Sequence, residues 1–247
     1  MNLRRWVLVI AALGAMGVLV VVARPSSSGP QTPGPNAPLS LRGPVLLVPG
    51  YGGDRDGLAE AARTLSAYGT TARVVDIGDG TGDLTAYAKK VVAQASALVR
   101  QGAPSVDLVG YSAGGLVARA AATSTDGQPL VRRVVTVGTP HAGTDLATLG
   151  AAFNACPTAC RQMEPGSAFL KGLPTANDPS RWLSMWSTSD EAVQPVTSSD
   201  LPGATDLPLQ DTCPGPVAHD QLMQDPLVLA AMTGFLANGT VPTTCPR

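Results

Sequence analysis

The pentapeptide at 110–114, Gly-Tyr-Ser-Ala-Gly, places Ser112 between glycines two residues before and two residues after it. A serine hydroxyl is a weak nucleophile until a base removes its proton, so it has to stand exposed on a rigid turn. The glycines allow that turn to be sharp. The alternative is an ordinary glycine turn. The context favours a nucleophile, because a predicted strand at 106–109 precedes the motif and a predicted helix at 116–122 follows it.

A base for this serine has to come from the two histidines of the chain, His141 and His219. If His141 were the base, the acid between it and Ser112 would be Asp126, which follows a helix and precedes a strand, at the wrong edge of the sheet. His219 follows the last predicted strand on a loop that can reach the carboxyl edge. We therefore predict His219 as the general base. For His141 we predict a local role, capping or lining the site.

The acid that orients the imidazole should follow a strand that lies between the serine and the histidine in the chain. Asp190 meets this requirement, because it comes just after a predicted strand at 182–186, whereas Asp178 precedes that strand. We predict Asp190 as the acid; the alternative interpretation is a solvated acidic turn. Other candidates are the adjacent Glu191 and the more remote Asp206 and Asp211.

An oxyanion formed at the serine needs hydrogen-bond donors, and the backbone N–H after the nucleophile, that of Ala113, is one candidate. The second candidate is Tyr51, in the glycine-rich loop at 50–53 that follows the first predicted strand. A phosphate-binding loop is excluded, because the segment lacks the Gly-Lys-Ser/Thr ending.

From residue 43 onward, short β-rich runs alternate with amphipathic helical stretches. This alternation predicts an α/β fold with a mostly parallel central sheet and helices on both faces, which would position these residues. The regular pattern breaks down between 144 and 182, which we predict to be rich in loops. The predicted strands are 45–48, 73–77, 106–110, 133–137, 182–186 and 204–209, and the predicted helices are 58–68, 84–100, 116–122 and 227–236.

The N-terminal region has the composition of a targeting segment followed by a tether. Residues 1–24 contain a basic start and an apolar run at 6–23, which fits either a cleaved signal peptide or an uncleaved membrane anchor. A buried helix is the less favoured alternative. Residues 25–42 are rich in Pro, Ser and Gly and predict an exposed linker. Residues 43–247 then form one catalytic domain, which is either secreted or anchored to the outer face of the membrane.

The four cysteines fit export to an oxidising compartment. Three pairings are possible, and we favour Cys156 with Cys160 and Cys213 with Cys245, because the first pair closes a short loop. Free buried thiols are the alternative, and the spacing does not suit a zinc site.

The formal net charge of -1 excludes the basic surface that nucleic-acid binding requires. Nothing in the sequence indicates an obligate protein partner.

Together these segments resemble the bacterial lipases of the α/β-hydrolase superfamily, especially compact secreted triacylglycerol lipases and esterases of class 2 type. The resemblance covers roughly residues 43–236. It includes the loop Pro-Gly-Tyr-Gly-Gly at 49–53, the serine motif at 110–115, and Gly-Thr-Pro-His-Ala-Gly-Thr at 138–144. It also includes Asp-Glu-Ala-Val at 190–193 and a later histidine. One departure is Pro49, where these lipases often have a histidine.

The resemblance implies an α/β-hydrolase fold and hydrolysis of carboxylic esters, with acylglycerols or other lipid esters as substrates. It implies an acyl-enzyme on Ser112, Asp190 and His219, with Tyr51 and Ala113 as oxyanion donors and no metal or organic cofactor. Two alternatives stay open: an acyltransferase that uses the same triad, and a surface-binding module that has lost activity. If residues 6–23 are retained, the membrane is a further partner.

Overall fold

The structure, a computed structural model, describes residues 36–53, 55–152 and 155–246. The predicted targeting segment at 1–24 and most of the predicted linker lie outside these ranges. Within them, no helix combines the length and the apolar character needed to cross a bilayer.

In the described part of the chain, six strands form one sheet in the order β2-β1-β3-β4-β5-β6, and every neighbouring pair is parallel. All carboxyl ends therefore meet at one edge, where loops can bring distant residues together. The predicted parallel sheet is confirmed. The strands are β1 (Val45–Val48), β2 (Ala72–Val74), β3 (Val106–Tyr111), β4 (Val131–Val137), β5 (Trp182–Trp186) and β6 (Thr205–Pro208).

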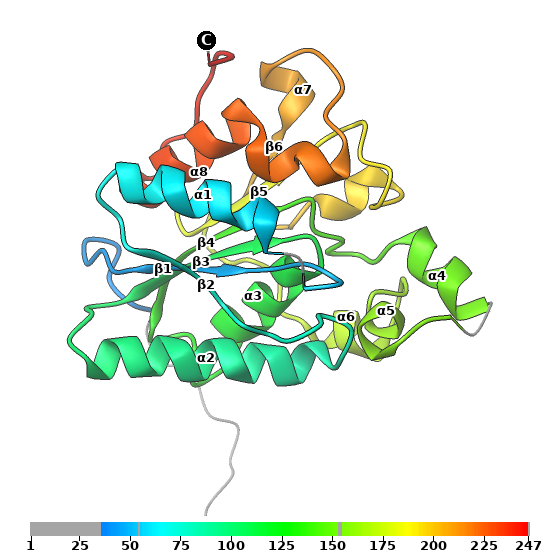
Figure 1. Cartoon of the computed structure of the whole chain (residues 1–247), viewed down its shortest axis with the longest axis horizontal. Helices are drawn as coiled ribbons and strands as arrows, with labels where there is room; N and C mark the ends of the chain where they lie inside the picture. Colours follow the sequence, from blue (N-terminus) through cyan, green and yellow to red (C-terminus); the bar gives the residue numbers. More distant parts are fainter. Residues whose placement is uncertain (1–35, 54, 153–154, 247) are drawn as a thin grey trace, which may run out of the picture. The chain divides into compact units, whose positions relative to one another are not determined.

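Among the described residues, four longer helices cover the two faces of this sheet (Figure 1). Successive strand side chains point to opposite faces, so Leu46 and Leu108 pack with α2 and α3, whereas Leu47 and Val109 pack with α1 and α8. Both layers are apolar on the side that meets the sheet, and this two-sided burial holds the strand ends in place. The helices are α1 (Asp56–Ala67), α2 (Leu84–Arg100), α3 (Ala113–Thr123) and α8 (Pro226–Asn238).

The region between β4 and β5 differs from the predicted loop, because it contains three short helices beyond the carboxyl edge of the sheet (Figure 1). Each is only one or two turns long, too short for a helical repeat of apolar residues to be recognised in the sequence. Other short helices occur after β5 and β6. These elements are α4 (Asp145–Ala152), α5 (Thr158–Gln162), α6 (Ala168–Gly172), η1 (Val196–Ser199), α7 (Leu209–Thr212) and η2 (His219–Gln224).

Two disulfides are present, and they join the pairs favoured from the sequence. Cys156–Cys160 joins α5 to the residues just before it, and Cys213–Cys245 spans 32 positions that include η2 and α8. Neither cysteine pair is therefore available to bind a metal.

The last residues of the predicted linker pack on the domain. Ala37 is buried, and its carbonyl accepts a 2.8 Å hydrogen bond from Arg181. The carbonyl of Leu39 accepts a hydrogen bond from Arg132 at 3.3 Å, and that of Leu41 accepts one from the Ser105 hydroxyl. These bonds use main-chain atoms, so the Pro- and Ser-rich composition gave no sign of them.

Candidate active site

Ser112 stands on a sharp turn between β3 and α3. Its backbone has φ 53° and ψ −128°, and among the described residues other than glycine it alone has a positive φ. The flanking glycines are required by contact: a Cβ on Gly110 would lie 2.4 Å from the Cα of Gly115, and one on Gly114 would lie 2.2 Å from the Val48 carbonyl oxygen. Strain of this kind concentrates at functional sites. The turn therefore has the geometry expected of a nucleophile.

Asp190 and His219 form a hydrogen-bonded pair, with 2.7 Å between Asp190 Oδ2 and His219 Nδ1. The Asp190 side chain is almost fully buried, and its other oxygen accepts hydrogen bonds from the backbone N–H groups of Ala192 (2.8 Å) and Val193 (2.9 Å). The carboxylate is thus fixed by its own loop, and it holds the His219 ring in one orientation. His219 itself is the first residue of η2 rather than part of an irregular loop.

The carboxyl end of β4 brings this pair next to Ser112. The Ser112 N–H donates to the Val137 carbonyl at 2.8 Å. A Cβ on the next residue, Gly138, would lie 3.2 Å from both His219 Cε1 and Asp190 Oδ2. Within the described residues, the Ser112 hydroxyl makes no hydrogen bond to His219. In enzymes without substrate this bond is often long, and it tightens when substrate binds.

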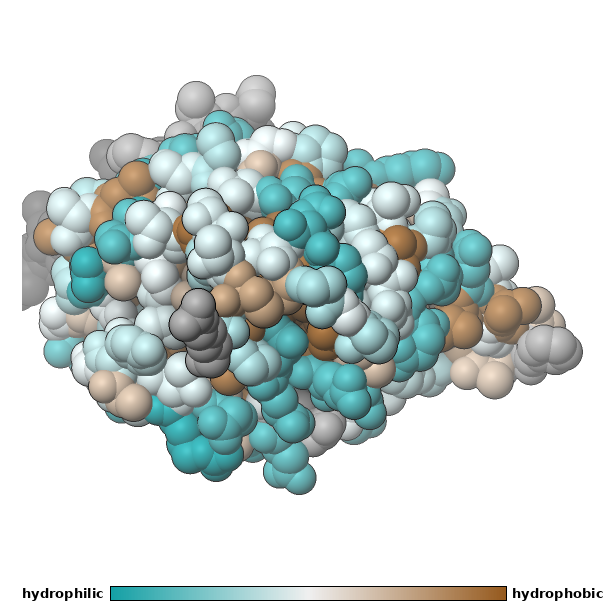
Figure 2. Space-filling model, turned by 90° about the horizontal axis from the view of Figure 1, so that it is seen from above, coloured by the Kyte–Doolittle hydropathy of each residue, from teal (hydrophilic) through white to brown (hydrophobic). Residues whose placement is uncertain are grey.

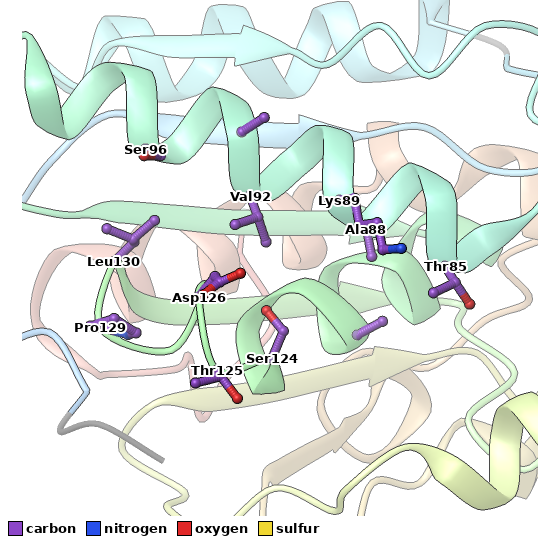
Figure 3. Close-up of a pocket in the computed structure, with 12 residues that line it drawn as sticks. Thr85, Ala88, Lys89, Val92, Ser96, Ser124, Thr125, Asp126, Pro129 and Leu130 are labelled. Atoms are coloured by element: carbon purple, nitrogen blue, oxygen red, sulfur yellow. The ribbon is translucent and has the colours of Figure 1, made fainter. Parts of the chain in front are cut away.

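The other acidic candidates lie elsewhere or make a different contact. Asp206 lies in β6 and Asp211 in α7, and neither forms the hydrogen bond to the His219 ring. Glu191 Oε2 accepts from the backbone N–H of His219 at 3.2 Å and does not contact the ring. Asp178 pairs with Arg181 at 3.2 Å, before β5 begins. Asp126 lies in the turn between α3 and β4, at the amino edge of the sheet, where it lines a groove of about 670 Å³ between α2 and α3 (Figure 3). None of the predicted catalytic residues lines that groove.

The glycine-rich loop after β1 lies against Ser112. A Cβ on Gly50 would be 3.0 Å from the Cβ of Ser112, and Tyr51 shares a cavity with Ser112. In the described structure, the backbone N–H groups of Tyr51 and Ala113 have no hydrogen-bond acceptor within the chain. Both donors are therefore free for a ligand at Ser112. Pro49, which replaces the histidine common in similar lipases, lies beside Gly114.

The cavity beside Ser112 has a volume of about 260 Å³ and a largely apolar lining. The helix α4 forms part of its rim: Leu146 is 49% exposed, and Leu149, on the same helix, is 56% exposed. Figure 2 shows hydrophobic surface at the end of the view that carries α4. The residues lining the cavity are Tyr51, Ser112, Pro140, Thr144, Leu146, Ala147, Cys160, Met163, Ala192 and Val193.

His141 is buried and directly follows Pro140, which lines the cavity. Its Nε2 lies 3.0 Å from Thr136 Oγ1, and burial together with the nearby Arg119 guanidinium holds its pKa well below 6.5. Arg119 is also buried; it donates to the carbonyls of His141 (3.3 Å), Leu173 (3.1 Å) and Pro174 (2.8 Å). His141 is therefore a neutral buried residue next to the cavity residue Pro140; it does not line the cavity, as one of its predicted roles required, and it lies outside the Asp190–His219 pair.

No group of three or more His, Cys, Asp or Glu side chains in the described ranges is arranged to hold a metal ion.

The family model of palmitoyl protein thioesterases matches residues 44–199, more than half of the chain. The chain belongs to this family. The matched segment contains Ser112, Asp190 and the loop at 50–53, and it ends before His219. A triacylglycerol lipase of Burkholderia plantarii is 30% identical over 158 residues, which are 58% of this chain and 40% of that lipase. The chain thus spans less than half the length of this relative.

Solved lipase structures share the fold over most of the chain. Lipase B of Aspergillus fumigatus has a TM-score of 0.68 at 21% identity, covering 82% of this chain and 54% of the lipase. The mature lipase BlEst2 of Bacillus licheniformis has a TM-score of 0.65 at 20% identity, covering 83% and 94%. At this identity the comparison establishes the α/β-hydrolase fold, which agrees with the prediction, and leaves the chemistry to be argued from the site.

Several site features of this family member were not predicted from the sequence. Gly138 leaves the space into which the Asp190–His219 pair fits, and Met163 and Val193 line the cavity. Gly138 and Val193 follow β4 and β5 at the carboxyl edge of the sheet. Their positions after predicted strands could therefore have indicated in the sequence that they lie near the site. Met163 lies far from any strand end and had no such signal.

Proposed function

We propose that the protein is a serine hydrolase that cleaves acyl esters through an acyl-enzyme formed on Ser112. The observation that carries this proposal is the Asp190–His219 hydrogen bond of 2.7 Å next to the strained turn that presents Ser112. A base oriented by a buried carboxylate, beside a partly exposed hydroxyl, is the arrangement that activates a serine.

In the proposed reaction, His219 Nε2 takes the proton of the Ser112 hydroxyl as the oxygen attacks the ester carbonyl. Asp190 keeps the Nδ1 proton on the imidazole and stabilises the imidazolium that forms. The tetrahedral intermediate collapses when His219 gives its proton to the leaving alcohol. A water molecule, activated by the same histidine, then attacks the acyl-enzyme and releases the acid.

The negative charge of the tetrahedral intermediate requires two donors that are not already used. The backbone N–H groups of Tyr51 and Ala113 meet this condition, because neither has an acceptor within the described chain. Removal of one such donor typically costs about 10²–10³ in kcat. We propose these two groups as the oxyanion hole.

The acyl group would lie in the cavity beside Ser112, whose Leu146, Met163 and Val193 offer apolar contacts. This lining supports a fatty acyl ester over a charged substrate, because a charge there would lose its hydration without a partner. Family membership adds a second candidate, an acyl thioester, whose carbonyl would react by the same steps. Two disulfides fit an oxidising compartment, and we propose that the domain acts outside the cytoplasm.

Labelling with a fluorophosphonate tests the nucleophile directly. We expect one covalent adduct on Ser112 in the wild type and none in Ser112→Ala, as read by mass spectrometry of the intact protein. A wild type that stays unlabelled, or a Ser112→Ala variant labelled at the same rate, would remove the basis of the proposal and favour a binding module.

To distinguish esters from thioesters as the substrate class, the substrates compared must carry the same acyl chains. A series of p-nitrophenyl esters and a series of acyl thioesters with the same acyl chains would be compared by kcat/KM, with an emulsified triglyceride beside them. Each reaction would be repeated with an added acceptor alcohol. Transfer to the alcohol that dominates at low acceptor concentration would assign the protein to acyltransferases instead.

A further inference from the structure

His219 is held at its main chain as well as at its ring. Its carbonyl accepts a hydrogen bond from the Tyr111 hydroxyl at 2.9 Å, and its N–H donates to Glu191 Oε2 at 3.2 Å. The ring is bonded separately, from Nδ1 to Asp190. The pairing with Asp190 sets how the ring is oriented, whereas the two main-chain bonds set where the residue stands.

Tyr111 is placed to link the base to the nucleophile. It is the last residue of β3 and directly precedes Ser112. Its ring also lies against the imidazole of His219, with 5.1 Å between ring centroids and a tilt of 32°. One side chain therefore joins the turn that carries Ser112 to the segment that carries His219, across 108 positions of sequence.

The segment around His219 has few other supports at this point. Residues 214–218 contain no helix or strand, and Gly215 has φ 123°. The short helix η2 begins at His219; its N-cap residue, Ala218, has no side chain that can cap, and its N–H donates to Gln221 Oε1 at 3.3 Å. The nearest buried apolar anchors of η2, Leu222 and Met223, come three and four residues later. On the other side, Val217, two residues before His219, is partly buried against the core. The bonds from Tyr111 and Glu191 hold the main chain of His219 itself, between these apolar contacts.

We propose that Tyr111 is a positioning residue for the general base, and that Glu191 supports the same main chain from the other side. The inference rests on the proposed function, because it assumes that His219 activates Ser112. Tyr111 is absent from the lining of the cavity, so it acts through His219 and not through the acyl group. A displacement of the general base by a fraction of an ångström lowers the rate of the chemical step, so the hydrogen bond from Tyr111 to the His219 carbonyl should affect kcat.

The variant Tyr111→Phe keeps the ring against His219 and removes only the hydroxyl. We expect kcat to fall about fivefold, the effect of losing one neutral hydrogen bond, with KM unchanged. We also expect the rate of fluorophosphonate labelling to fall in parallel. Amide hydrogen exchange in a peptide spanning 217–224 should become faster, whereas exchange in α2 should stay the same. Tyr68→Phe, at a tyrosine that is 72% exposed at the end of α1, is the matched control and should alter none of these quantities.

Variants of Glu191 provide a second, independent test of the support for the His219 main chain. Glu191→Gln keeps a side-chain oxygen that can accept the His219 N–H, so we expect near wild-type kcat, while Glu191→Ala should lower kcat with KM unchanged. The pair Tyr111→Phe and Glu191→Ala, combined in a double-mutant cycle, should lower kcat by more than the product of the two single effects, because each bond restrains the same residue.

The outcomes separate the two proposals. If the wild type reacts with the probe but Tyr111→Phe has the same kcat, or exchanges at 217–224 at the same rate, the positioning role of Tyr111 is overturned and the proposed function stands. A raised KM with unchanged kcat would overturn it as well, since that result places Tyr111 in substrate binding. If the wild type neither reacts with the probe nor cleaves any substrate, the proposed function fails and the positioning role fails with it.

Discussion

The carboxylate of Asp190 uses both of its oxygens, one for His219 and the other for the N–H groups of Ala192 and Val193. An acid in this position accepts on two sides and has no donor to offer. An asparagine could satisfy the two N–H groups only with its single oxygen, and its NH₂ group would then face Nδ1 of the histidine. The geometry of the pair therefore makes the acceptor at residue 190 decisive for the tautomer of His219.

The first prediction concerns this pair. Asp190→Asn should lower kcat by about 10⁴-fold while the protein stays folded, because the imidazole adopts the wrong tautomer. Steady-state kinetics and circular dichroism measure the two effects. Asp126→Asn, in the groove of Figure 3, is the control. A loss of less than tenfold at position 190 would indicate that another acid orients His219.

The second prediction concerns the depth of the cavity. Met163 is nearly buried and lines the cavity, so Met163→Ala should extend it. We expect the best substrate in an ester series to become about two carbons longer, since each methylene buried contributes ~0.8 kcal/mol. Val92→Ala, which removes apolar volume in the other groove, controls for general loosening. An unchanged chain-length profile would place the acyl chain elsewhere.

At the scale of elements, α3 both follows Ser112 and binds two neighbouring segments of the chain. Its Arg119 reaches out of the helix to the carbonyls of residues 141, 173 and 174, and so ties α3 to the loop after β4 and to the end of α6. Burial lowers the pKa of Arg119 to about 10, which still leaves the guanidinium charged at neutral pH. The loop after β4, which includes the cavity residue Pro140, is therefore attached to α3.

The third prediction is that Arg119→Ala lowers the free energy of unfolding by roughly 2–4 kcal/mol, because three carbonyls lose a charged donor. Arg119→Lys should recover only part of this, since an ammonium cannot reproduce the planar fork. Urea denaturation measures both variants. Equal stability of the lysine variant and the wild type would show that the charge alone matters.

The longer elements could be predicted from the sequence, because the two periodicities that define them are visible over several turns or strand residues. The helix at 84–100 and the strand at 182–186 have the predicted bounds. The order of residues along a parallel sheet also predicts that Ser112 and Asp190 meet at one edge. The short helices between β4 and β5 and the contact from Tyr111 to His219 could not be predicted, because they depend on tertiary packing and not on local pattern.

At the scale of the whole molecule, a buried neutral histidine couples stability to pH. Burial, together with Arg119, lowers the pKa of His141 well below 6.5, its ordinary value in the unfolded chain. Below pH 6.5 the unfolded chain therefore binds a proton that the folded protein does not. Keeping His141 neutral therefore costs no stability above pH 6.5, whereas the free energy of unfolding decreases as the pH falls below 6.5.

The fourth prediction compares the free energy of unfolding at pH 7.5 and pH 5.5. Over this range the wild type should lose about 1 kcal/mol more than His141→Gln, because only the wild type carries this proton linkage. Urea titrations at the two pH values give the difference, and His219, present in both proteins, cancels. Parallel losses in the two proteins would mean that residue 141 is protonated in the folded state.

The bridge between Cys213 and Cys245 encloses His219, η2 and α8 within one covalent ring. A protease that cut the irregular segment at 214–218 would break the chain on one side of the histidine only. The two fragments would remain joined through the bridge and would separate on a gel only after reduction. The part of the molecule that carries His219 would thus stay attached after a single cut in this segment.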